Sequence, residues 1–186
     1  GSRATYVRAG MGGLEGRKLA AGDALPLLPP PLSGPERRID RVVTDDPAAA
    51  IRVVLGPQDD YFTTESIAVF LSSHYEVTWQ ADRMGYRLEG PPLEHSRGFN
   101  IVSDAILPGS IQVPGNGRPI VLLRDAQTTG GYPKVATIIS ADLGRFAQLR
   151  PLSRMRFAAV TPAAAQLLRR EFITRVQATG LRTRAA

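Results

Sequence analysis

The stretch "PIVLLRDAQTTGGYPKVATII", residues 119–139, places a polar segment with two adjacent glycines between two apolar runs. The runs at 119–123 and 135–139 are rich in β-branched and aliphatic residues, which favour strands. Gly130, Gly131 and Pro133 are typical of a turn. The stretch therefore predicts two core strands joined by a hairpin-like loop. By itself, this loop is either a solvated turn or a segment that binds a substrate.

Further short strands are predicted on both sides of this stretch, at residues 51–55, 75–80, 110–113 and 155–160. Glycine and proline turn signals separate them, as in a β-barrel or a β-sandwich. In 75–80, Tyr75, Val77 and Trp79 alternate with polar residues, so all three are expected on the inward face.

Three helices are also predicted. The first covers 63–71 and starts at a threonine cap, and the second covers 140–149 with Ser140 or Asp142 as its cap. The third begins at a proline after the cap Thr161 and ends before Gly180. Its apolar stripe consists of Leu168, Phe172 and Val176. We expect this stripe to pack on the barrel, with a partner protein as the alternative.

The N-terminal part contains many glycines, but their spacing fits neither a dinucleotide-binding fingerprint nor a Walker motif. Tight turns are the simpler interpretation. We expect an arm at 1–28, which would be the remnant of a preceding half, and a proline-rich linker at 29–38. A barrel domain at 39–160 and a C-terminal helix and tail at 161–186 would follow.

Composition excludes several kinds of protein. The 186 residues carry a net charge of +6 and no cysteine, and no apolar run is long enough to cross a bilayer. The arginines are scattered, so we expect no nucleic-acid partner and no membrane association. Without cysteine or a paired-histidine motif, no metal site is predicted. The absence of cysteine also agrees with a reducing, cytoplasmic location.

Several motifs occur together in one order: "SRATYVRAGMGGLEGRKLAAGDALPL", "GPQDDYF", "DRMGYRLEGP" and "SDAILPGSIQVPGNGRPIVLLRDAQTTGGYPKVATI". With these motifs the chain closely resembles the KipA family from Ser2 to about Val160. This family is also called the biotin-dependent carboxyltransferase family, allophanate hydrolase subunit 2, or the C subunit of 5-oxoprolinase.

The resemblance implies a mainly β fold, a cyclophilin-like β-barrel with a few peripheral helices. It implies a composite assembly with a KipI-like B subunit and a third lactam-hydrolase subunit. Such an assembly uses ATP to open the lactam of 5-oxoproline. Two alternatives remain within the family: carboxyl transfer from carboxybiotin, as in urea carboxylase, and antagonism of the kinase inhibitor KipI. Biotin would be needed only in the first of these.

Given this resemblance, the polar loop becomes a candidate site. Asp125 is the candidate general base, and Lys134 is the candidate electrostatic stabiliser. Arg83 could hold a substrate carboxylate through a bidentate fork, although a structural ion pair with Asp125 is an equally good interpretation. Amide recognition is assigned to Gln112 and Gln127. The other predicted substrate-binding residues are Tyr86, Thr128, Thr129, Gly130, Gly131 and Tyr132.

Members of this family usually carry a first half before the "SRAT" segment, and that half is missing here. The chain therefore resembles the C-terminal part of a longer protein. We expect the fragment alone to be inactive, because a site shared between two halves would be incomplete.

Overall fold

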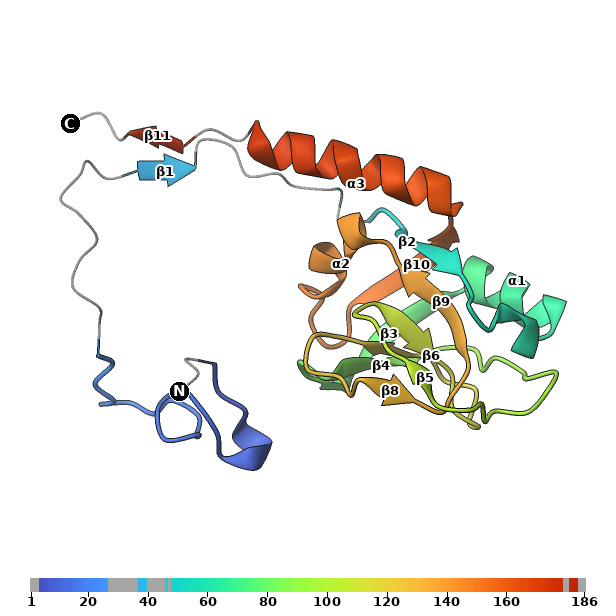
Figure 1. Ribbon diagram of the computed structural model, residues 1–186, viewed down its shortest axis with the longest axis horizontal. Helices are drawn as coiled ribbons and strands as arrows, with labels where there is room; N and C mark the ends of the chain where they lie inside the picture. Colours follow the sequence, from blue (N-terminus) through green and yellow to red (C-terminus); the bar gives the residue numbers. More distant parts are fainter. Residues whose placement is uncertain (1–3, 27–36, 40–45, 47, 179–180, 184–186) are drawn as a thin grey trace. The chain divides into compact units, whose positions relative to one another are not determined.

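The structure is a computed structural model that describes residues 4–26, 37–39, 46, 48–178 and 181–183. The chain divides into two compact units, one formed by Gly1–Arg38 with Leu181–Ala186 and the other by Ile39–Gly180. Figure 1 shows the course of the chain. Most of the linker predicted at 29–38 lies outside the described residues.

Glycine turns dominate the described part of the first unit. It contains one short 3-10 helix, η1 (Val7–Ala9), and Gly10, Gly12, Gly13 and Gly16 have φ angles of 55° to 71°. A Cβ atom on Gly16 would lie 2.0 Å from the backbone oxygen of Gly10, so only glycine fits there. The prediction of tight turns is confirmed. Strands β1 (Arg37–Ile39) and β11 (Leu181–Thr183) form a separate two-stranded sheet.

The second unit is built around a closed barrel in the order β10-β2-β9-β6-β7-β4-β3. Its strands are β2 (Ile51–Leu55), β3 (His74–Ala81), β4 (Gly85–Glu89), β6 (Ser110–Gln112), β7 (Ile120–Leu122), β9 (Lys134–Ile138) and β10 (Arg154–Ala159). Strands β10 and β2 are parallel, and the other neighbours are antiparallel. The mainly β-barrel fold with peripheral helices is confirmed.

Both apolar runs of the stretch 119–139 are strands, β7 and β9, but they do not form a hairpin with each other. Strand β6 lies between them, because Ile111 pairs with Val121 on one side and with Ala136 on the other. The prediction of a simple hairpin was therefore wrong. The residues between β7 and β9 instead contribute β8 (Thr129–Gly130), which pairs with β5 (Asp104–Ala105) in a small ribbon.

The barrel core consists of residues that alternate along the strands. Val53, Tyr75, Val77, Ile111 and Val121 are completely buried. Trp79 does not follow this pattern, because its exposed fraction is 76%. The pairing of β3 with β4 shifts register between Val77 and Ala81, which turns this side chain to the outer face. The prediction that Trp79 faces inward was wrong for this reason.

In the described residues of the second unit, three α-helices and one 3-10 helix, η2 (Asp59–Tyr61), accompany the strands. Helix α1 (Thr64–Ser72) is capped by Thr63, whose side chain accepts a hydrogen bond from Ser66 N. Helix α3 (Pro162–Gln177) is capped in the same way by Thr161. Both caps confirm the prediction, and they satisfy backbone N–H groups that a helix cannot satisfy internally.

Helix α2 (Ser140–Phe146) differs from its prediction, because its N-cap is Ile139 and no side chain caps it. Asp142 is completely buried and instead accepts hydrogen bonds from Arg52 N at 2.8 Å and Arg52 Nε at 3.0 Å. Arg52 Nη2 donates to the other carboxylate oxygen at 2.5 Å, and Arg145 Nη2 adds a fourth bond at 3.2 Å. Burial would raise the pKa of Asp142, but the hydrogen bonds from Arg52 and the charges of both arginines lower it. This carboxylate fastens α2 to β2.

Helix α3 lies alongside α2, as Figure 1 shows. Leu168 and Phe172 are half-buried, whereas Val176 has an exposed fraction of 46%. The predicted stripe is therefore only partly covered. None of the described residues of α3 is fully buried.

Candidate functional site

The most unusual side chain in the barrel is that of Lys134, the first residue of β9. Its exposed fraction is only 3%, and its Nζ lies 2.7 Å from Oδ2 of Asp104 on β5. The carboxylate, in contrast, has an exposed fraction of 46%. A buried ammonium needs a partner of opposite charge. The pair therefore places a buried positive charge behind an anion that solvent can reach.

Gln58 fixes this pair in position. Its Nε2 donates to Asp104 Oδ2 at 3.1 Å, and its Oε1 accepts from the backbone N of Lys134 at 3.2 Å. Its own backbone N–H donates to the carbonyl oxygen of Lys134. One amide side chain thus holds both members of the ion pair to the loop that follows β2.

The hydrogen bond from the Lys134 ammonium, together with those from Gln58 and from the backbone of Ala105, lowers the pKa of Asp104 to about 2. The carboxylate is therefore ionised at neutral pH and is a hydrogen-bond acceptor. Because its pKa is low, the carboxylate is a weak base. It is therefore suited to orient a substrate N–H group more than to abstract a proton.

Gln112 lies next to this pair, at the end of β6, where it is opposite Lys134 in the strand register. It is buried, and its Nε2 donates to the carbonyl oxygen of Tyr132 at 3.2 Å. A Cβ atom on Gly130 would lie 2.4 Å from this Nε2 atom. A side chain at position 130 would displace the Gln112 amide, so glycine at this position leaves room for Gln112.

The remaining polar residues of the loop lie at the surface. Gln127, Thr128 and Thr129 are exposed, and the carbonyl oxygen of Thr128 accepts a hydrogen bond from Ile106 N at 2.9 Å. The carbonyl oxygen of Gly131 accepts another from Ile101 N at 2.9 Å. Tyr132 has an exposed fraction of 40%. The loop is therefore fastened along 101–106.

Arg83 and Asp125 form a separate pair between the β3–β4 turn and the segment after β7. Arg83 Nε lies 2.9 Å from Asp125 Oδ2, and Arg83 Nη2 donates to Oδ1 at 3.0 Å. The bidentate fork predicted for a substrate carboxylate is thus directed at Asp125.

Tyr86, also a predicted substrate contact, donates through its hydroxyl to Ala147 O at 2.9 Å and packs on Phe146.

Sequence reasoning did not single out Gln58 or Asp104. Both residues occur in the quoted motifs, Gln58 in "GPQDDYF" and Asp104 in "SDAILPG", but the sequence alone did not show which residues they contact.

Among the described residues there is no cluster of three or more histidine or acidic side chains that could hold a metal ion. In the same part of the chain, no helix is both long enough and apolar enough to cross a membrane.

Comparison with known proteins gives this geometry a context. Residues 1–159 match the model of the family described as "Carboxyltransferase domain, subdomain A and B". The chain belongs to this carboxyltransferase domain family. Its carboxyltransferase domain therefore includes the whole barrel, and helix α3 follows the matched region.

Two curated relatives are each 41% identical in sequence to this chain. The C subunit of 5-oxoprolinase from Escherichia coli aligns over 80% of this chain and 47% of its own length. The C subunit of 5-oxoprolinase from Haemophilus influenzae aligns over 91% of this chain and 54% of its own length. The chain thus spans about half the length of the curated relatives that it matches.

Among solved structures, urea carboxylase from Kluyveromyces lactis superposes with a TM-score of 0.78 at 24% identity. The match covers 96% of this chain and 18% of that protein. At this level of identity the likeness establishes the fold of the carboxyltransferase domain and nothing further.

Proposed function

We propose that this carboxyltransferase domain is part of a 5-oxoprolinase subunit, which acts in an ATP-dependent complex on the C–N bond of a lactam. The buried Lys134, paired with a solvent-facing Asp104, is the observation that carries the proposal. The 41% identity to two 5-oxoprolinase C subunits supports the choice of reaction.

The site offers complementary groups for a lactam. The Lys134 ammonium has three N–H donors, of which Asp104 takes one, so it can also donate to a substrate carbonyl or carboxylate oxygen. Asp104, as an ionised acceptor, can receive the lactam N–H. Gln112 carries an amide with a second Nε2 hydrogen beyond the one given to Tyr132. Together they can bind and orient both ends of an amide bond.

Stabilisation of charge on the carbonyl oxygen is the step that this site can assist. When water adds to a lactam carbonyl, negative charge develops on the oxygen, and a buried ammonium stabilises that charge more than solvent does. ATP would supply the driving force at the level of the complex. Asp125, the predicted general base, stays a prediction, as do the substrate roles of Arg83, Tyr86 and the exposed loop residues.

The proposed partners are a KipI-like B subunit and a third lactam-hydrolase subunit. The names of the two relatives, which designate each of them as a C subunit, support an assembly of several subunits. The cytoplasmic location and the domain boundaries also remain proposals.

Carboxyl transfer is the second candidate, and the family description itself favours it. In that case Asp104 and Lys134 would orient the acceptor amide in the same manner. Lys134 could not serve as the biotin-bearing lysine, because it is buried. Carboxybiotin would have to come from another domain.

The two candidates are separated by an assay of the intact gene product mixed with the B subunit and the third subunit. 5-Oxoproline cleavage is measured with and without ATP, and biotin-dependent carboxylation of urea is measured in parallel. ATP-dependent formation of glutamate supports the first function. Carboxylation without lactam cleavage supports the second, and inactivity in both assays contradicts both.

A further inference from the structure

The outer face of the β3–β4 pair exposes the only tryptophan of the chain. Trp79 is 76% exposed, and the register shift between Val77 and Ala81 is what turns it outward. Bulges of this kind re-aim side chains at functional surfaces. Exposing so large an apolar ring loses the stabilisation that its burial would give. Trp79 therefore requires an explanation outside the barrel core.

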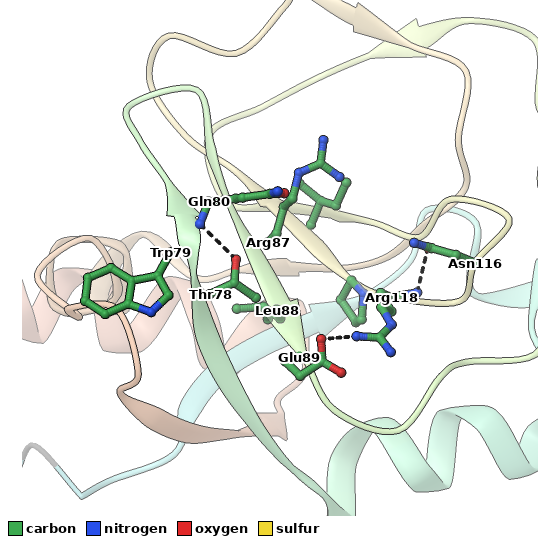
Figure 2. Close-up of a pocket in the computed structure, with 10 residues that line it drawn as sticks. Thr78, Trp79, Gln80, Arg87, Leu88, Glu89, Asn116 and Arg118 are labelled. Carbon is green, nitrogen blue, oxygen red and sulfur yellow. Dashed lines mark hydrogen bonds and ion pairs between the residues drawn. The ribbon is translucent and has the colours of Figure 1, made fainter.

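A hollow of about 380 Å³ adjoins this tryptophan. Its lining includes Thr78 and Gln80 from β3, Arg87 from β4, and Asn116 and Arg118 from the turn before β7. Figure 2 shows the Gln80 and Arg87 side chains extending beside each other, with the indole of Trp79 standing clear of its strand. We refer to Trp79, Gln80, Arg87 and Arg118 as the Trp79 face.

The two arginines of this face differ in their partners. Arg118 forms an ion pair with Glu89, and its backbone N–H donates to Asn116 Oδ1 at 3.1 Å. Arg87 is exposed, and its guanidinium has no ion-pair partner in the described part of the chain. The hollow is thus lined both by an unneutralised guanidinium and by an exposed aromatic ring.

We propose that the Trp79 face docks an acidic segment of another subunit of the assembly. A carboxylate of that segment pairs with Arg87, and an apolar side chain packs on the Trp79 ring. The proposal rests on the proposed function, because it takes its partner from the multi-subunit complex. It concerns a surface different from the Lys134–Asp104 site.

Two features favour a protein partner over a free small anion. Tryptophan and arginine are the residue types most enriched among the dominant contacts of protein interfaces. The unpaired charge is positive, in a chain of net charge +6, so complementarity selects an acidic surface. A small anion would use Arg87 but would leave the indole of Trp79 without a role.

The test is calorimetric titration of the B subunit and, separately, of the third subunit into the chain, followed by the variants Trp79→Ala and Arg87→Glu. Leu167→Ala and Arg169→Glu on helix α3 are matched controls, because Leu167 and Arg169 are also exposed. Each variant of the Trp79 face should reduce the affinity for one of the two subunits at least about tenfold. The controls should bind within about twofold of the parent. Raising the salt concentration should weaken the parent more than Arg87→Glu.

Unchanged affinity in both face variants, with normal binding of the parent, would overturn this inference and leave the proposed function intact. Loss of affinity to the same degree in the controls would also overturn it. If the parent binds neither of the two subunits, the docking surface and the proposed function both fail. If the complex assembles through the Trp79 face but does not cleave 5-oxoproline, only the proposed reaction fails.

Discussion

Lys134 Nζ lies 2.7 Å from Asp104 Oδ2, with the lysine side chain 3% exposed and the carboxylate side chain 46% exposed. The pair joins β9 of the barrel to β5 of the neighbouring ribbon. It therefore fastens the ribbon that contains β5 and β8 to the barrel, and it places the proposed site on a rigid scaffold.

The lowered pKa of Asp104 predicts a specific dependence of stability on pH. Because the pKa falls from its ordinary value to about 2 in the folded chain, the contribution of Asp104 is fully present above about pH 4. It is lost as the pH falls toward 2. In urea denaturation, the difference in unfolding free energy between the parent and Asp104→Asn should be constant near neutral pH. It should shrink at acid pH, and a difference that grows with acidity would contradict the assignment.

The two adjacent glycines of the loop should respond differently to the same substitution. Gly130→Ala places a methyl group 2.4 Å from Gln112 Nε2, so this flexible amide must move away from Tyr132. Gly131→Ala meets only Ile101 O, at 3.6 Å. Both variants should unfold within about 1 kcal/mol of the parent. Only Gly130→Ala should weaken binding of 5-oxoproline to the assembled complex, as measured by calorimetry. Equal affinities in the two variants would remove Gln112 from the site.

Asp142 should be the most sensitive acidic residue of the barrel unit. Asp142→Ala leaves Arg52 and Arg145 without their buried partner, so the free energy of unfolding should fall by about 3–5 kcal/mol. Asp60→Ala is the matched control, because its ion pair with Arg97 is exposed and should be worth at most about 1 kcal/mol. Similar urea midpoints for the two variants would show that the buried cluster does not stabilise the fold.

The Arg83–Asp125 pair is exposed on its arginine side, with exposed fractions of 63% and 28%. A double-mutant cycle with Arg83→Ala and Asp125→Ala should give a coupling free energy of about 0.2–1 kcal/mol in urea denaturation. A coupling well above this range would mean that the pair is a main stabilising contact. Asp125 would then be a poor candidate for a general base.

Local patterns in the sequence predicted most of the secondary structure. The strand 51–55 and the helix caps Thr63 and Thr161 follow from residue type and spacing alone. The neighbours of each strand did not, since β6 pairs on both sides through long-range contacts that leave no local pattern. Trp79 was misplaced because a register shift breaks the period of two on which the inward face was assigned.

The residues of the candidate site were likewise predicted only in part from the sequence. Lys134 and Gly130 were predicted from the stretch 119–139 and Gln112 from the family resemblance, and the structure brings the three together. Asp104 and Gln58 were missed because they are 30 and 76 residues away from Lys134 in the chain. For Arg83 and Asp125 the sequence left a substrate-binding role and a structural ion pair equally open, and the structure shows the ion pair.

The most direct test of the central claim is the rate of ATP-dependent glutamate formation from 5-oxoproline by the assembled complex, with Lys134→Met against the parent. Lys18→Met is the matched control, because Lys18 is exposed and is the only other lysine. We predict that the parent and Lys18→Met turn over equally, and that Lys134→Met loses at least about a hundredfold in rate while its complex still assembles. An intact complex in which Lys134→Met is as fast as the parent would contradict the account.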